Sequence, residues 1–226
     1  MKKTFIFLVA AILLNSCASA VLTSKTVKAS EIKSMVNFEP ISFVHLIQKG
    51  NQNKMNDSLS NVSTQLLSSV IINNTNPKVE KQITFSNPEI KSRIETDILK
   101  TMSEIIKTKK IDQIKTTPLM DSIVKNENQR FALCIITSGF DRRKGNYGNQ
   151  VAKGVGIGLL TLGLYTSVPV KASTSMYAMI YDVQNSNVVF YKHIPAVEKS
   201  PTDKKNLSNL YQELFEGYFY KMQQQD

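Results

Sequence analysis

Apolar and polar residues follow two different periods along this chain, and these periods predict its secondary structure. Short alternating or continuous apolar runs are typical of strands, whereas apolar residues three and four positions apart are typical of helices. The patterns predict strands over 37–47, 79–85, 130–139, 174–183 and 187–193, and helices from 57 or 58 to 70 and over 88–106, 118–125 and 207–222.

The order of these elements, β-α-β-α-α-β-β-β-α, predicts an α/β fold, with an α+β arrangement as the alternative. We expect a single domain in which helices pack on a mixed sheet of about five strands, with an amphipathic helix at the end of the chain. The run 130–139 is apolar on both faces, as a central strand must be. The polar residues 184–186 are expected to join the last two strands as a hairpin.

Local signals refine the first strand and the first two helices. Pro40 indicates an edge or the start of a strand, because proline cannot donate a backbone hydrogen bond to a neighbouring strand. Asp57 or Ser58 is expected to cap the first helix, and Pro88 to occupy the first position of the second. The expected apolar faces are Leu59, Val62, Leu66 and Val70 on the first helix, and Ile90, Ile94, Ile98, Met102 and Ile106 on the second.

The N-terminus has the features of an export signal. Lys2 and Lys3 precede an unbroken apolar run over 5–14, which is too short to span a bilayer but suits the core of a signal peptide. The following residues, Leu14-Asn15-Ser16-Cys17, resemble a bacterial lipobox, in which the cysteine is lipidated and becomes the new N-terminus. This resemblance implies a signal peptide over 1–16 and a lipid on Cys17.

Two other interpretations of the N-terminus remain open. Cleavage after Ala18-Ser19-Ala20 would discard Cys17 with the signal, and Cys17 is otherwise an incidental apolar residue of the leader. Every interpretation exports the protein. With a lipidated Cys17, residues 17–36 are expected to form a lipidated tether, and residues 37–226 the folded domain. No acidic run follows Cys17, so we expect an outer-membrane protein that faces the periplasm.

Composition narrows the classes of function. The chain has 226 residues, a formal net charge of +10, two cysteines and two histidines. Two cysteines exclude a disulfide-dense fold and four-cysteine zinc modules. Cys134 lies in an apolar strand, so we expect a structural rather than a reactive thiol. His45 and His193 have no histidine or cysteine at ligand spacing, and we expect no metal, cofactor or catalytic residue.

The element order and the lipobox carry a family resemblance. The chain is similar to the small α/β domain shared by the N-terminal part of TolB and by curli-secretion (CsgG-type) lipoproteins. The matching features are Ser58-Leu59-Ser60 at the first helix, the turn Tyr181-Asp182-Val183 and the returning strand Val188-Val189-Phe190. The resemblance implies an envelope lipoprotein without catalytic residues. The chain departs from it at 185–187, where Asn-Ser-Asn stands in place of the family's frequent glycine.

A glycine-rich apolar insertion is expected at about 151–171, where no charge lies between Lys153 and Lys171. It packs on its own domain, or contacts the membrane or another subunit, since small residues allow backbones to approach closely in lipid. The glycine spacing does not match a phosphate-binding loop. The expected contact residues are Gly154, Gly156, Gly158, Leu160, Leu162 and Gly163.

Two basic clusters are candidates for anion binding. Arg142, Arg143 and Lys144 are expected to contact lipid headgroups or other anions, or to form a solvated loop tip. The cluster at 107–110 ends a predicted helix, where cations complement the helix dipole, and that role accounts for it. Because the protein is exported, no nucleic acid partner is expected.

Three classes of function remain. We favour a non-catalytic, lipid-anchored binding or assembly component of the cell envelope, with an envelope protein or another copy of the chain as partner. The alternatives are an oligomeric secretion or pore component that uses the glycine-rich insertion, and an envelope hydrolase whose site the sequence does not reveal.

The lipobox generates the first testable prediction. Several acyl chains on one cysteine give stable membrane attachment, whereas a single chain binds only marginally. Cys17→Ala is therefore expected to release the protein into the soluble periplasm or to leave an uncleaved precursor. Membrane fractionation and mass spectrometry of the N-terminus provide the measurement. Unchanged fractionation, with no lipid on Cys17, would contradict the prediction.

Overall fold

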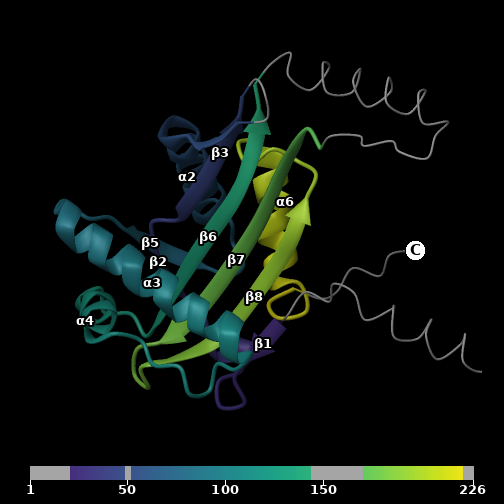
Figure 1. Cartoon of the computed structure of the whole chain (residues 1–226). Coiled ribbons are helices and arrows are strands. Elements are labelled where there is room, and N and C mark those ends of the chain that lie inside the picture. Colours follow the sequence, from purple (N-terminus) through teal and green to yellow (C-terminus); the bar gives the residue numbers. More distant parts are fainter. Residues whose placement is uncertain (1–20, 49–51, 144–169, 221–226) are drawn as a thin grey trace, which may run out of the picture.

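The computed structural model describes residues 21–48, 52–143 and 170–220, which form one mixed sheet of eight strands with helices on both faces (Figure 1). The predicted α/β fold is confirmed. The sheet is wider than the expected five or so strands because short strands were not anticipated from the sequence. Its strand order is β1-β8-β7-β6-β2-β5, and β3 pairs with both β6 and β4.

The strands and helices have the following bounds. The strands are β1 (Val21–Thr23), β2 (Met35–Phe38), β3 (Ile41–Ile47), β4 (Asn53–Met55), β5 (Val79–Ile83), β6 (Phe131–Arg142), β7 (Ala172–Asp182) and β8 (Asn187–Val197). The helices are the 3-10 turn η1 (Ala29–Glu31) and the α-helices α2 (Asp57–Ile72), α3 (Pro88–Thr108), α4 (Pro118–Asn126) and α6 (Lys204–Phe215).

Strand β6 lies in the middle of the sheet. It pairs antiparallel with β7 from Phe131 to Asp141, and its other edge runs parallel first to β2 and then to β3. The interruption between β2 and β3 falls at Glu39 and Pro40, and β3 begins directly after the proline. The single strand expected over 37–47 is therefore two strands in series along one edge of β6. Pro40 marks the start of the second.

The side chains of β6 point alternately into two separate cores. Phe131, Leu133 and Ile135 belong to a cluster completed by α2 and α6, whereas Ala132, Cys134 and Ile136 belong to one completed by α3 and α4. Figure 1 shows the same layers, with α3 and α4 in front of the sheet and α2 and α6 behind it. The expectation of a central strand that is apolar on both faces is confirmed.

The segment before residue 37 corrects the predicted boundary between tether and domain. Val21–Thr23 pairs antiparallel with β8, and Val27 and Ile32 are buried in the core beneath α6. Within the described residues, the fold thus begins at residue 21 rather than 37. The segment is rich in serine and lysine and has few apolar residues, so its composition favoured a tether. A strand of three residues is also too short to show an alternating pattern.

Helix α2 differs from its prediction in its cap and in the face that it buries. The cap is Asn56, whose Oδ1 accepts a hydrogen bond from the Leu59 N–H at 2.9 Å, so the expected Asp57 or Ser58 is wrong. The buried residues are Ser63, Leu67, Val70 and Ile71, and of the expected set only Val70 is among them. Apolar residues cover more than one face of this helix, so periodicity alone did not determine its rotation.

Helix α3 begins as predicted, with Asn87 as its cap and Pro88 at its first position. Ile94, Ile98 and Met102 of the expected stripe are buried, but Ile90 and Ile106 at its two ends are 38% and 41% exposed. A spacing of four residues exceeds the 3.6 residues of one helical turn, so the stripe turns away from the sheet at both ends. Thr101 and Ile105 take the buried positions that the stripe leaves.

Helix α6 ends earlier than the predicted residue 222, at Phe215. The C-cap Glu216 is already extended, with φ -62° and ψ 131°, and Gly217 follows it with a φ of 80°, which favours glycine. Tyr218 lies beyond the helix yet packs on Phe190, with ring centroids 4.5 Å apart. Beneath this end, the Nζ of the buried Lys192 donates a hydrogen bond to the carbonyl of Glu213 at 2.5 Å, which satisfies an acceptor that the helix leaves open.

The packing of α6 predicts that the domain needs this helix. Truncation before Leu207 removes every buried side chain of α6 except Asn206, and we expect it to abolish cooperative unfolding. Phe215→Ala is expected to lower the free energy of unfolding by about 3–5 kcal/mol. Gln212→Ala, at an exposed position of the same helix, is expected to change it by less than about 0.5 kcal/mol. Urea unfolding measures all three, and an unchanged melt of the truncated chain would refute the prediction.

Candidate binding site

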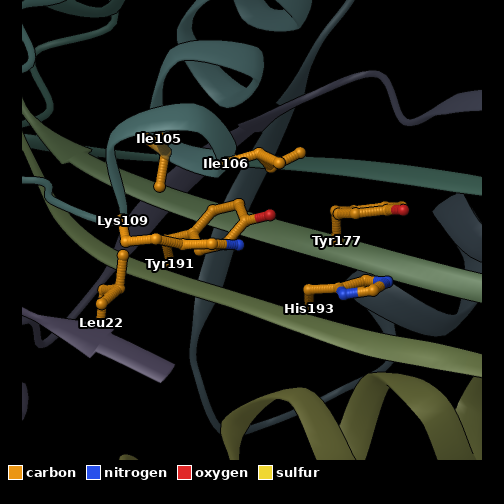
Figure 2. A pocket seen from close by; sticks show the side chains of 7 residues that line it. All are labelled: Leu22, Ile105, Ile106, Lys109, Tyr177, Tyr191 and His193. Atoms are coloured by element: carbon orange, nitrogen blue, oxygen red, sulfur yellow. The ribbon is translucent and has the colours of Figure 1, made fainter. Parts of the chain in front are cut away.

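A cavity of about 210 Å³ lies where the C-terminal end of α3 meets the sheet (Figure 2). It opens on the face of the sheet that α3 and α4 partly cover. Strand β1 and helix α3 supply its apolar side, and β7 and β8 supply its aromatic side. The lining residues are Leu22, Ile105, Ile106, Lys109, Tyr177, Tyr191 and His193.

Two stacked rings form one wall of this cavity. Tyr177 of β7 and His193 of β8 are directly opposite in the antiparallel register, so their side chains leave the same face of the sheet. Their ring centroids are 4.2 Å apart and their planes differ by 11°. Both side chains are half-buried. The register between two neighbouring strands thus places a stacked pair of rings on one side of the cavity.

The electrostatics of the cavity favour the uncharged forms of the His193 imidazole and the Tyr191 phenol. Burial, and then the nearby ammonium of Lys109, lowers the pKa of His193 below its ordinary value of 6.5. Burial, and then the neighbouring Tyr177, raises the pKa of Tyr191. At neutral pH the wall therefore offers hydrogen-bond donors and acceptors without charge.

Lys109 is the charged residue of the lining, and the backbone fixes its position. It ends α3 in the left-handed conformation, with φ 56° and ψ 30°, and its N–H donates to the carbonyl of Ile105 at 2.8 Å. Among the described residues, no carboxylate lies within salt-bridge distance of its ammonium. Sequence reasoning assigned this lysine only to the helix dipole. Its place in a cavity depends on β7 and β8, which are distant in sequence.

The cavity continues into a strip of half-buried side chains on the same face of the sheet. Ser138 lies opposite both Phe43 and Ser175, and the Oγ atoms of Ser138 and Ser175 are 2.9 Å apart. Phe140 lies opposite His45. We call these five residues, Phe43, His45, Ser138, Phe140 and Ser175, the open strip. Among residues 21–48, 52–143 and 170–220, Figure 1 shows no helix in front of this end of the strands.

The basic cluster predicted for anion binding lies at the end of β6. The Nε of Arg142 donates a hydrogen bond to the carbonyl of Val170 at 2.6 Å, and its guanidinium lies 5.8 Å from the ring centre of Phe140. Arg143 is exposed. Arg142 thus joins the end of β6 to the residues that precede β7. Anion contact by Arg142 and Arg143 stays a prediction.

The other predicted site residues lie outside the described part of the chain. They are the lipidation residue Cys17, the third cation Lys144, and the residues of the glycine-rich insertion, Gly154, Gly156, Gly158, Leu160, Leu162 and Gly163. The described residues therefore bear neither on the lipid nor on the membrane or subunit contact proposed for the insertion.

Cys134 and Asp182, whose side-chain types are often catalytic, have structural roles here. Cys134 is 1% exposed, and burial raises the pKa of its thiol. Asp182 is fully buried and accepts hydrogen bonds from Arg130 Nε at 3.0 Å and Arg130 Nη2 at 2.7 Å. Burial alone would raise the pKa of Asp182, but hydrogen bonds from Arg130, Asn185 and the Gln184 N–H outweigh it and lower the pKa. This carboxylate secures the start of the β7–β8 hairpin.

Among the described residues, no group of three or more histidine, cysteine, aspartate or glutamate residues is placed to hold a metal ion. None of the helices in these ranges combines the length and the apolar character needed to cross a membrane.

Comparison with known proteins gives distant structural likenesses. No family model matches the chain, and no curated protein matches it. The C-terminal domain of LpoB from Salmonella enterica is similar at a TM-score of 0.33 and 13% identity, over 78% of this chain and 88% of that one. A PelC dodecamer from Paraburkholderia phytofirmans is similar at a TM-score of 0.31 and 10% identity, over 90% of this chain and 100% of that one. At these TM-scores neither likeness identifies a fold family or a function.

The stacked histidine generates a prediction about pH. Because the pKa of His193 is lowered in the folded state, the unfolded chain binds the proton more readily. The contribution of His193 to stability is therefore constant above about pH 6.5, and is lost as the pH falls through the folded-state pKa. His193→Phe retains a ring against Tyr177 and is expected to remove this contribution. Urea unfolding at pH 5 and pH 7.5 measures the difference.

A charge variant tests the cause of the shift. Lys109→Met is expected to raise the pKa of His193 towards 6.5 without reaching it, because the effect of burial remains. Lys107→Met, on the exposed side of the same helical turn, is expected to leave it unchanged. Titration of the His193 ring protons by NMR measures the pKa. Equal pKa values in both variants would contradict the electrostatic role of Lys109.

Proposed function

We propose that this protein is a non-catalytic, lipid-anchored binding component of the bacterial cell envelope, held by a lipid on Cys17 and facing the periplasm. The open strip and the adjoining cavity are its binding surface. The observation that carries the proposal is the row of half-buried aromatic, imidazole and hydroxyl side chains that crosses β3, β6 and β7, over which no helix of the described residues lies.

The chemistry of the strip supports binding in two ways. Phe43 and Phe140 are only half-buried, so a partner can remove further apolar surface from water. Aromatic side chains are also enriched at protein interfaces. Ser138, Ser175 and His45 supply hydrogen-bonding groups beside them. Because these side chains stand on paired strands, they hold fixed positions before any partner arrives, which lowers the entropic cost of binding.

The anchor is proposed from the lipobox. The variant Cys17→Ala tests it, and Cys134→Ala is the matched control, since that thiol is buried within the sheet and cannot carry a lipid without unfolding. The oligomeric secretion or pore component stays an alternative that rests on the sequence of 151–171. The envelope hydrolase also stays an alternative.

Site-specific photo-crosslinking in living cells tests the binding surface. A benzoyl-phenylalanine in place of Phe140 keeps an aromatic ring in the open strip, and the same residue in place of Gln65 lies exposed on α2, on the other face of the sheet. Adducts are expected from position 140 and not from position 65. Equal adducts from both positions would contradict the proposal. Adducts of two copies of the chain would instead favour the oligomeric alternative.

A further inference from the structure

We infer that the cavity between α3 and the β7–β8 pair binds a small organic monoanion with a planar apolar group, as in an aryl carboxylate. The inference rests on the proposed binding function and names the ligand class of one part of that surface. Size, shape and charge each restrict the ligand, and together they select this class.

Size restricts the ligand to a small molecule or the end of a larger one. The volume is about 210 Å³, and an apolar cavity of about 150 Å³ is large enough to bind benzene. A benzene ring with a short acidic side chain occupies a space of this order. A long acyl chain or a folded protein segment does not fit within it.

Shape favours a planar group. The rings of Tyr177 and His193 stack on each other and offer a ligand their edges and outer faces, and Ile105, Ile106 and Leu22 supply the apolar surroundings. Aromatic pairs prefer offset or edge-to-face contact and gain roughly 0.5–1.5 kcal/mol beyond simple burial. A planar apolar ligand can make such contacts with these rings, whereas a strongly hydrated, purely polar ligand would lose water without compensation.

Charge selects an anion. The lining contains the ammonium of Lys109 and no carboxylate. Figure 2 shows the Lys109 nitrogen and the Tyr191 hydroxyl on the side of those residues that faces Tyr177 and His193. A carboxylate placed beside them would pair with the ammonium of Lys109 and accept a hydrogen bond from the Tyr191 hydroxyl. The αL backbone of Lys109 at the end of α3 fixes the point from which this side chain extends into the lining of the cavity.

Ligand-observed fluorine NMR tests the inference on the full-length protein in mild detergent. The probe is 4-fluorophenylacetate, and 4-fluorophenylacetamide is its neutral match. The acid is expected to bind with a dissociation constant of about 1 mM or tighter, and the amide at least about tenfold more weakly. Equal affinities for acid and amide, or no broadening beyond that in detergent alone, would overturn the inference.

Variants of two neighbouring lysines distinguish the effect of the charge inside the cavity from the effect of the protein's net charge. Lys109→Met is expected to weaken binding of the acid about tenfold, and Lys109→Arg to keep it within about threefold. Lys107→Met carries the same loss of charge at a site outside the cavity and is expected to bind as the unaltered protein does. Equal loss of binding in Lys107→Met and Lys109→Met would attribute the effect to net charge and overturn the assigned site.

The same chemistry also occurs at the free C-terminus of a peptide that ends in phenylalanine. Gly-Gly-4-fluorophenylalanine, with its carboxyl group free or amidated, distinguishes this source from a free aryl acid. Tighter binding of the free peptide than of 4-fluorophenylacetate would support the ligand class with a peptide source, and weaker binding would support it with a free acid. If no acid binds but crosslinks from position 140 persist, the ligand class fails while the proposed function stands.

Discussion

The rest of the structure depends on the requirement that β6 be apolar in both directions. Helices lie on both faces of the sheet, so alternate side chains of this strand enter separate cores, and neither set can be polar without a partner. This requirement accounts for Cys134, which fills a small apolar position and whose thiol is kept protonated by burial. It also sets the register of β7, which pairs with β6 from Phe131 to Asp141.

The candidate site results from a mismatch between strand length and helix coverage. Strands β6, β7 and β8 have 12, 11 and 11 residues, and α3 and α4 cover one end of their shared face. Towards the uncovered end the side chains of this face change from fully buried Ala132 and Cys134 to half-buried Ser138 and Phe140. The cavity lies at the transition, where α3 ends over the sheet.

Local patterns predicted much of the fold, because the signals for individual elements are local. Asn87-Pro88, the doubly apolar strand around Cys134 and the polar turn at Ser186 each depend on a few adjacent residues. The predicted buried face of α2 was wrong, and the predicted buried stripe of α3 was incomplete. Burial of Leu67 and Thr101 depends on how each helix packs on the sheet, which local sequence does not determine. The site was less accessible to sequence reasoning. Tyr177 and His193 meet only through strand register, and Lys109 in a basic run had an adequate local explanation.

The hydrogen bond from Arg142 to the carbonyl of Val170 closes the chain on itself at the end of the sheet. Residues 143 and 170 are thereby held at neighbouring strand ends, whatever length of chain joins them. Closing a longer connection costs little, since each doubling of length adds only about 0.6 kcal/mol of entropy. Loop closure by itself therefore sets only a weak limit on the number of residues between these two points.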